Sequence, residues 1–375
     1  MVGRVADREV VVIGGGPAGL ATAIELRQRG IEVMVVEGSR PPIDKACGEG
    51  IMPEGVARLK SMGIEIDQRA CRDIGGIRYF DGETVAEARF PSRCAMGVRR
   101  TELHTAMVER AVDSGAELVW GEKVQGISAR EVMTERGLVS ARWIVGADGL
   151  RSRVRRWAGL EGSSSEPQRF GVRQHFRSQP WTDLVEVYWG SDCEAYVTPV
   201  GSGEVGVALL WSGKKANFEQ LLARHPALER RLQGAEPSSR ARGAGPLRHR
   251  VSGVARQRVA LVGDAAGYRD AITGEGLSMA FLQASALAGA IENEDLLEYK
   301  RRAARLARLP NALIAGLLFV EQRPVLRHRL IQTLADSPGL FSRLLAIHAR
   351  ERPLTSLGLS GAARLTVGLL RPMST

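Results

Sequence analysis

The sequence has few cysteines and no cysteine motif. Its 375 residues include four, none of them in a C-x-x-C pair: Cys47, Cys71, Cys94 and Cys193. Such scattered thiols argue against a zinc site or a disulfide framework, and no metal site is predicted. The amino-terminal apolar run ends in GGG and lacks the pattern of an export signal. These absences predict a cytoplasmic location.

Long apolar runs and lysine are also scarce. The run ALIAGLLFV is too short to span a bilayer, so no transmembrane segment is predicted. Only six of the 52 basic residues are lysines, and residues 301–375 contain twelve arginines against three acids. This region therefore carries nine of the ten net positive charges. It is either a contact for an anionic membrane surface or acidic partner, or a solvated helical face. No nucleic-acid partner is predicted.

Three segments have the pattern of a strand, a glycine turn and a helix. The first, EVVVIGGGPAGLATAIELRQRG, is followed by IEVMVVE, which predicts a βαβ unit with buried parallel strands. The others are ARWIVGADGLRSRVRR and QRVALVGDAAGYRDAITGEGLSMAFLQA. A further helix is predicted from about Thr101 to Ser114, ending at Gly115.

The region between the second and third segments has a different sequence pattern. From about 165 to 212, RFGVRQHF, LVEVYWG and EAYVTPVGSGEVGVALLW show the alternation that is typical of strands. An earlier hairpin is indicated by the turn at Asp81 and Gly82. After residue 285 the pattern is helical, with breaks predicted at Pro310 and Pro324.

These elements predict an α/β protein built from three units. A Rossmann-like dinucleotide-binding domain is expected to be discontinuous, with residues 1–72, 93–160 and 251–300. An antiparallel β-sheet substrate domain would comprise residues 73–92 and 161–250, and a basic helical C-terminal region residues 301–375.

The first glycine turn fits a dinucleotide. Gly14, Gly16 and Gly19 form G-x-G-x-x-G between a strand and a helix. They permit, in that order, a tight turn, a close approach to a pyrophosphate and close helix–strand packing. Glu37 is the last residue of the next predicted strand. A carboxylate at this position accepts hydrogen bonds from a ribose and repels a 2′-phosphate. The pattern favours FAD or NAD over NADP.

Five motifs in this order resemble the FAD-dependent oxidoreductases of the para-hydroxybenzoate hydroxylase fold, especially geranylgeranyl reductases and related monooxygenases. They are VVVIGGGPAGLATAIELRQRGIEVMVVE, KACGEGIMP, GVRRTELH, GADGLRSRVRR and GDAAGYRDAITGEGLSMA. The resemblance covers most of residues 8 to 290 and implies an FAD-binding domain of the GR2 type. FAD would be the tightly held cofactor, with electrons from transient NAD(P)H or a separate reductase.

The resemblance implies cofactor contacts in every motif. The residues concerned are Gly14, Gly16, Pro17, Ala18, Gly19, Glu37, Lys45, Cys47, Arg100, Val124, Asp148, Asp264, Gly274, Glu275, Gly276 and Leu277. Asp264 would bind the ribityl or pyrophosphate part, and the turn from Gly274 to Leu277 would pass beneath the flavin ring. Arg99 is an alternative to Arg100.

Fewer residues are candidates for chemistry or substrate binding. Cys47 is a candidate catalytic thiol near the flavin. Arg173 and His175 share one face of an alternating strand, and Tyr196 lies on a facing segment. We expect these three to contact substrate, with His175 able to handle a proton near neutral pH.

Two departures from the reductase pattern guide the choice of reaction. Ala271 stands where reductases usually have proline, and AYVTP replaces their aromatic Y-x-W-x-F-P signature. The first interpretation is therefore a monooxygenase that hydroxylates or epoxidises an apolar or aromatic small molecule. The alternative is a reductase of isoprenoid or quinone-like double bonds, and a rival of another class is a non-enzymatic escort or binding protein.

Overall fold

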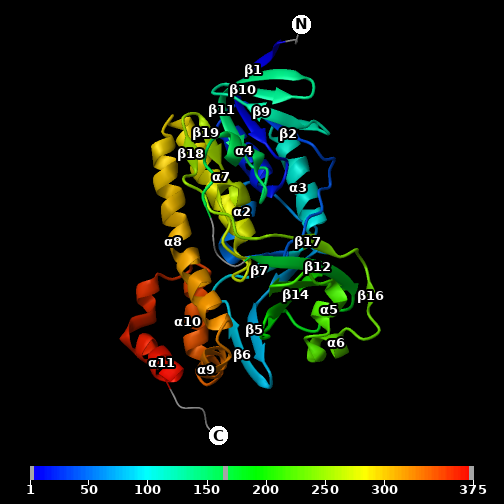
Figure 1. Cartoon of the computed structure of the whole chain (residues 1–375), viewed down its shortest axis with the longest axis vertical. Helices are drawn as coiled ribbons and strands as arrows, with labels where there is room; N and C mark the ends of the chain where they lie inside the picture. Colours follow the sequence, from blue (N-terminus) through cyan, green and yellow to red (C-terminus); the bar gives the residue numbers. More distant parts are fainter. Residues whose placement is uncertain (1–3, 164–167, 371–375) are drawn as a thin grey trace.

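The computed structural model of the chain describes residues 4–163 and 168–370. Figure 1 shows a parallel sheet with its helices in the upper half, a second sheet in the lower half, and C-terminal helices along one side. Segments far apart in sequence meet in the upper half.

The upper sheet has a parallel centre with the strand order β18-β19-β11-β1-β2-β8, extended by the β9–β10 hairpin. Its strands are β1 Arg4–Ile13, β2 Val33–Glu37, β8 Glu117–Trp120, β9 Val124–Ile127, β10 Glu131–Thr134, β11 Gly137–Gly146, β18 Ala255–Arg256 and β19 Val259–Leu261. Along β1, Val10 and Val12 enter one core while Val11 and Ile13 enter the core on the opposite face. Burial on both faces explains why the central strands read as continuous apolar runs.

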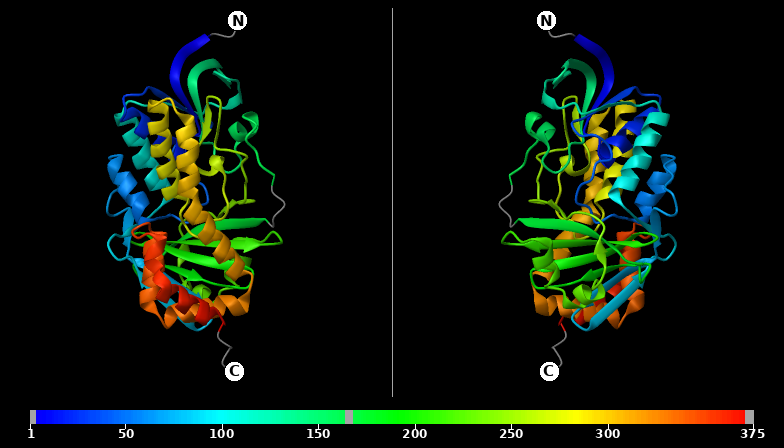
Figure 2. Two further views of the ribbon diagram at one scale, coloured as in Figure 1. Left: turned by 90° about the vertical axis from the view of Figure 1, so that its left-hand side faces the viewer. Right: turned by 90° about the vertical axis from the view of Figure 1, so that its right-hand side faces the viewer.

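Helices cover both faces of this sheet, as Figure 2 shows from the side. One face carries α1 Pro17–Arg27, α2 Pro53–Ser61, α3 Arg100–Asp113 and α7 Gly276–Glu292. The other face is covered by α4 Arg153–Trp157 and the short 3-10 helix η1 Gly263–Ala266. The three predicted strand–turn–helix segments are thus confirmed, and their glycine turns meet at the same edge of the sheet.

The lower sheet has the order β16-β12-β15-β14-β13-β5-β6, with β17 also paired to β12. Its strands are β5 Gly76–Asp81, β6 Thr84–Arg89, β12 Arg169–Arg177, β13 Leu184–Tyr188, β14 Cys193–Gly201, β15 Glu204–Ser212, β16 Glu236–Pro237 and β17 Arg242–Ala244. The expectation of a purely antiparallel sheet is wrong at one pair, because β5 and β13 are parallel. The early hairpin is inserted through a long connection, which a parallel pair requires.

Smaller elements complete the sheets. A three-stranded sheet between the two halves contains β3 Gly50–Ile51, β7 Ala95–Val98 and β4 Cys71–Ile74. Helices α5 Phe218–Leu222 and α6 Pro226–Arg231 cover one face of the lower sheet and share a core with β12, β14 and β15.

The C-terminal helices cover the other face of the lower sheet, around β5 and β6. They are α8 Leu296–Glu321, α9 Pro324–Ala335, α10 Pro338–His348, the 3-10 helix η2 Leu354–Leu357 and α11 Gly358–Leu370. Side chains of α8, α9 and α10 share a core with Ala86, Ala88 and Trp189. This region is therefore folded onto the sheet, and α8 runs across the boundary predicted at residue 300.

The prediction of a helix break at Pro310 is wrong, whereas α9 does begin at Pro324. Pro310 lies inside α8 and is buried. Because proline has no N–H, the Leu306 carbonyl loses its partner one turn away. Arg350, which follows α10, donates to this carbonyl through Nη2 at 2.8 Å. A tertiary bond thus takes the place of a helical one.

The apolar run of nine residues, which by itself is too short to span a bilayer, is only part of helix α8. By length and composition alone this helix could cross a membrane, and 22% of its most apolar window is buried inside the protein.

A double-mutant cycle tests the role of Arg350 at Pro310. We expect Arg350→Ala to lower the free energy of unfolding by about 1–3 kcal/mol, because it leaves a backbone carbonyl unpaired. In a Pro310→Ala background the backbone N–H gained at position 310 would satisfy that carbonyl, so the same change should cost about 1 kcal/mol less. Urea denaturation of the four proteins measures the coupling. Strict additivity would contradict this account.

Candidate active site

The first glycine turn is shaped by two close backbone contacts. Gly14 has φ 115°, and a Cβ there would lie 2.4 Å from the Ala147 carbonyl oxygen. A Cβ on Gly19 would lie 1.9 Å from the Gly14 oxygen. Gly16 precedes α1 and would meet only the Arg100 guanidinium at 3.5 Å. An anion bound here would lie between a helix N-terminus and an arginine, which is the arrangement that a pyrophosphate needs.

The acid at the end of β2 is oriented by backbone donors. Glu37 accepts hydrogen bonds from the N–H of Gly15 at 2.9 Å and of Ser39 at 2.8 Å. It borders a hollow of about 180 Å³ whose lining includes Gly14, Glu37, Lys45, Val124 and Asp148. Five residues predicted to contact the cofactor, from distant parts of the sequence, therefore come together.

Asp148 accepts hydrogen bonds within the protein that were not predicted from the sequence. Its carboxylate accepts from the Ser152 hydroxyl at 2.5 Å and from the N–H of Arg153 and Val154 at 2.7 and 3.1 Å. These bonds hold the start of α4. Cofactor contact by Asp148, implied by resemblance, stays a prediction, although the residue borders the hollow.

Arg155 binds the second and third motifs together. Its buried guanidinium donates to the carbonyl oxygens of Leu150 at 3.0 Å, Ala265 at 3.3 Å and Asp264 at 3.4 Å. Gly263 is fixed from the other side by its N–H bond to Gln283 Oε1 at 2.8 Å. The backbone beside Asp264 is thus held rigidly.

The Asp264 side chain, in contrast, is free for a ligand. Within residues 4–163 and 168–370 no hydrogen bond reaches its carboxylate. Burial raises the pKa of Asp264, while the charges of Arg100, Lys45 and Arg155 act to lower it. A half-buried carboxyl group that accepts no hydrogen bond from the described residues fits the hydroxyl groups of a ribityl chain.

The choice between Arg99 and Arg100 follows from their neighbours. Arg99 points to Glu204, with Nη1 at 3.5 Å from Oε1, whereas Arg100 lies beside Gly16. Arg100 is therefore the residue placed at the glycine turn.

Glu49 connects the two halves of the molecule, and it was not selected from the sequence. It is 1% exposed and has φ 59°. Its Oε1 accepts from the Arg100 backbone N–H at 2.9 Å, and its Oε2 lies 2.5 Å from His175 Nε2. Its position in the KACGEG motif is the signal that could have pointed to Glu49. Nothing in the neighbouring sequence indicated that its side chain pairs with His175 on β12.

Arg173 and His175 do share a face of β12, as predicted, but the protein itself occupies their polar atoms. Arg173 donates to Asp44 Oδ1 at 2.5 Å and to the Lys45 carbonyl at 3.2 Å. His175 contacts Glu49 through Nε2 and Ser239 Oγ through Nδ1 at 2.8 Å. Both residues hold the 44–49 loop in place. Their contact with substrate stays a prediction.

Cys47 lies in this loop and carries an uncharged thiol. Burial raises its pKa, and the Glu49 charge adds to this effect, against the lowering influence of Arg100. The Glu49 N–H donates to Cys47 Sγ at 3.4 Å. Such a thiol is a poor nucleophile but can donate a proton.

An aromatic cluster adjoins the turn at Gly274. Tyr79 packs edge-on against Trp189 at 5.7 Å and lies 5.0 Å from Phe341. The Tyr196 hydroxyl donates to the Ile272 carbonyl at 3.4 Å, which ties the predicted substrate residue to the turn. Tyr79 and Tyr196 keep some exposed surface, yet burial raises both pKa values. Both side chains pack against the core between the lower sheet and the C-terminal helices.

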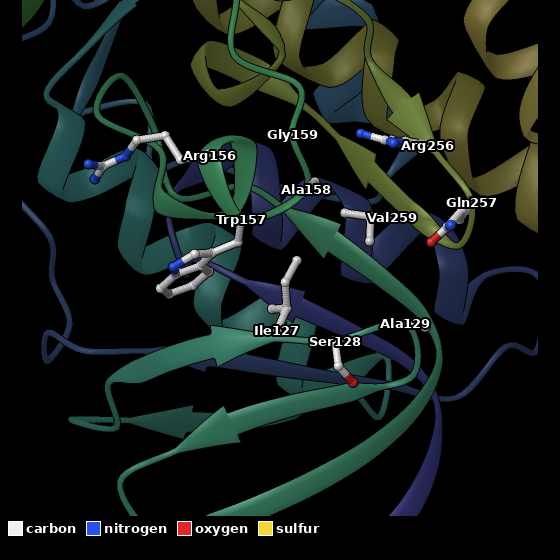
Figure 3. A pocket seen from close by; sticks show the side chains of 10 residues that line it. All are labelled: Ile127, Ser128, Ala129, Arg156, Trp157, Ala158, Gly159, Arg256, Gln257 and Val259. Carbon is white, nitrogen blue, oxygen red and sulfur yellow. The ribbon is translucent and has the colours of Figure 1, made fainter.

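A second hollow, of about 350 Å³, lies beside α4 (Figure 3), and Trp157 borders both hollows. The second hollow is bordered by residues such as Ile127, Trp157 and Arg256 and contains none of the predicted site residues. In Figure 3 the Arg156 side chain points away from Arg256. The two guanidinium groups therefore do not converge on one ligand.

Fold and site together define an FAD-dependent flavoprotein oxidoreductase. The glycine cradle with Arg100, the hollow beside Glu37 and the unpartnered Asp264 are groups that fit the parts of a long dinucleotide. The chain belongs to the family described as FAD binding domain, whose model matches residues 7–294.

Relatives and solved structures agree with this assignment. The chain is 30% identical over 298 residues to a menaquinone reductase of Mycolicibacterium smegmatis, which covers 72% of each protein. It is 27% identical to a digeranylgeranylglycerophospholipid reductase of Methanosarcina mazei, over 75% of this chain and 74% of that protein. A flavoprotein/dehydrogenase from Cytophaga hutchinsonii has the same fold, with TM-score 0.79, 18% identity, and coverage of 91% and 92%.

Replacing Asp264 tests the cradle. We expect Asp264→Ala to raise the Kd for FAD by ~10- to 100-fold, because a hydrogen bond to a charged group contributes about 1.5–3 kcal/mol. The cofactor-free protein should keep its melting temperature, since this carboxylate has no partner in the described residues. Fluorescence titration with FAD measures the affinity. Asp183→Ala, which removes an exposed carboxylate paired with Arg89, is the control, and equal FAD affinity in all three proteins would contradict the assignment.

Proposed function

We propose that the protein uses FAD to reduce a carbon–carbon double bond in an apolar isoprenoid or quinone-linked molecule. The observation that carries the proposal is the uncharged thiol of Cys47, in a loop locked by Glu49, Arg173 and His175. The sequence placed monooxygenation first. The relatives at 27–30% identity are reductases, and this favours double-bond reduction.

Once reduced by its electron donor, bound FAD would supply a hydride to one carbon of the double bond. The adjacent carbon then needs a proton, and the half-buried thiol of Cys47, whose pKa burial raises, holds one at neutral pH. Arg173 and Glu49 fix the loop that carries this thiol. The aromatic cluster around Tyr79 and Tyr196 excludes water and suits an apolar ring or chain.

Electrons for each turnover come either from NAD(P)H that binds transiently or from a separate reductase, because one dinucleotide fingerprint is visible in the sequence. A non-enzymatic escort would not need an unpartnered Asp264 beside Arg100 and Lys45.

Product masses distinguish reduction from oxygenation. We expect the FAD-loaded protein, reduced without oxygen, to add two hydrogens to a prenylated naphthoquinone or a geranylgeranyl lipid. At saturating FAD, Cys47→Ala should slow this step by ~100-fold or more, in the range of general acid catalysis. Cys71→Ala, which removes a half-buried thiol on β4, is the control.

A product that carries one added oxygen in air, with none formed anaerobically, would overturn the reductase proposal and support the monooxygenase. Retention of lipid without any FAD binding would support the escort.

We further propose that the protein contacts an anionic membrane from the cytoplasmic side through η2 and α11. Large apolar side chains are exposed here, including Leu354, Leu359 at 91% exposure, and Leu370. Arg352 and Arg364 are exposed beside them, and residues 352–370 contain no acid. Apolar side chains flanked by arginine fit the boundary of an anionic bilayer.

Vesicle sedimentation tests this contact. Leu359→Asp should weaken binding to vesicles that contain phosphatidylglycerol by ~10-fold or more, since it removes about 2 kcal/mol of burial and adds a negative charge. Neutral phosphatidylcholine vesicles should bind weakly throughout. Leu297→Asp, which changes another exposed leucine at the opposite end of the C-terminal helices, should behave as wild type. Equal losses in both variants would contradict a contact at α11.

A further inference from the structure

The C-terminal region reaches the turn that the sequence assigned to the flavin ring. His348, the last residue of α10, lies with Nε2 at 3.6 Å from Glu275 Oε1. Its ring also has a hydrogen bond with the Thr273 backbone. Residues far apart in the sequence thus meet at the N-terminus of α7. The family match ends at residue 294, so His348 lies outside it.

Two polar atoms at this contact have no hydrogen-bond partner within the described part of the chain. They are Glu275 Oε2 and His348 Nε2. Glu275 is 7% exposed, so water does not readily replace the missing partner. Buried polar atoms in folded proteins are nearly always satisfied. Two such atoms side by side indicate a place for a polar atom of a ligand.

The pair is uncharged at mildly acidic pH. Burial raises the pKa of Glu275 to about 7, opposed by the charge of Arg350. Burial lowers the pKa of His348 to about 4, and Arg350 lowers it further. Between these values a neutral carboxylic acid faces a neutral imidazole. The acid donates a hydrogen bond, which suits a carbonyl or hydroxyl oxygen better than a carboxylate or phosphate.

The surroundings of the pair are apolar. Phe341, Leu345 and His348 are spaced along one face of α10. Phe341 contacts Tyr79, and Leu345 shares a core with Ile272. Phe341 and Leu345 are both buried, so the polar pair lies at the edge of an apolar core, next to the Gly274 turn.

We propose that Glu275 and His348 form the polar end of the substrate pocket, where they bind a carbonyl or hydroxyl oxygen of an otherwise apolar, ring-bearing substrate. This inference rests on the proposed function and names the chemistry that the pocket selects. Backbone groups of the 274–277 turn were assigned to the cofactor, which leaves the Glu275 side chain available. Glu275 and His348 are positioning residues for the reaction, and the C-terminal region supplies one of them.

A matched pair of probes tests the proposal without turnover. The probes are 2,3-dimethyl-1,4-naphthoquinone, which has two carbonyls and no free position for thiol addition, and 2,3-dimethylnaphthalene, which has none. Binding to the oxidised, FAD-loaded protein is measured by calorimetry. We expect the quinone to bind ~10-fold more tightly, as one satisfied hydrogen bond predicts. Its affinity should fall as pH rises through about 7, because ionised Glu275 cannot donate.

Single substitutions distinguish hydrogen bonding by Glu275 and His348 from apolar packing around the probe. Glu275→Gln keeps a donor and should bind the quinone tightly without pH dependence, whereas Glu275→Ala and His348→Ala should lose the preference for the quinone. Phe341→Ala should weaken both probes alike. His225→Ala, which removes another buried imidazole whose pKa burial lowers to about 4, is the control and should change neither probe.

The outcomes separate this inference from the function proposed above. Equal binding of the two probes, or an undiminished preference in His348→Ala, would overturn the inference even if double-bond reduction is observed. Absence of FAD binding, seen before any probe is added, would instead overturn the proposed function.

Discussion

The buried carboxylate of Glu49 is the contact on which the geometry of the site depends. It accepts from the Arg100 N–H, at the start of a helix of the upper domain, and contacts His175 in the lower sheet. A charge that is 1% exposed is stable only with partners on all sides. Both domains must therefore be docked before Glu49 is satisfied, and that docking sets the position of Cys47.

A second constraint acts on the cofactor cradle. Parallel strands end at the same edge of a sheet, so the glycine turns after β1, β11 and β19 meet there. Gly14 and Gly19 allow this approach because a side chain at either position would collide with the backbone. Arg155 then fixes the second and third turns to each other. The carboxylate of Asp264, which accepts no hydrogen bond from the described residues, is left as the group predicted to bind the cofactor.

The C-terminal helices extend the site, although they lie outside the family match. Pro310 leaves the Leu306 carbonyl unpaired, Arg350 binds it, and His348 two residues earlier faces Glu275. A proline usually ends a helix, but Pro310 stays inside α8. The carbonyl that it leaves unpaired holds the segment around Arg350 in place. The same region exposes leucines and arginines on its outer surface, while His348 and Phe341 face inward, toward Glu275 and Tyr79.

The sequence by itself determined the three strand–turn–helix segments and the main strands of the lower sheet, because periodicity and glycine spacing are local properties of the chain. Local pattern also predicted Glu37 at the end of β2, whereas FAD itself and the choice of Arg100 or its neighbour came from the resemblance of five motifs to a family. Only the tertiary structure decided that β5 pairs in parallel with β13, that Pro310 stays inside a helix, and that Glu49, Arg173 and His175 form one network. It also brought His348 to Glu275. These pairings join residues that are distant in the chain, and they are fixed by the burial of charge and by packing between layers, which leave no periodic trace in the sequence.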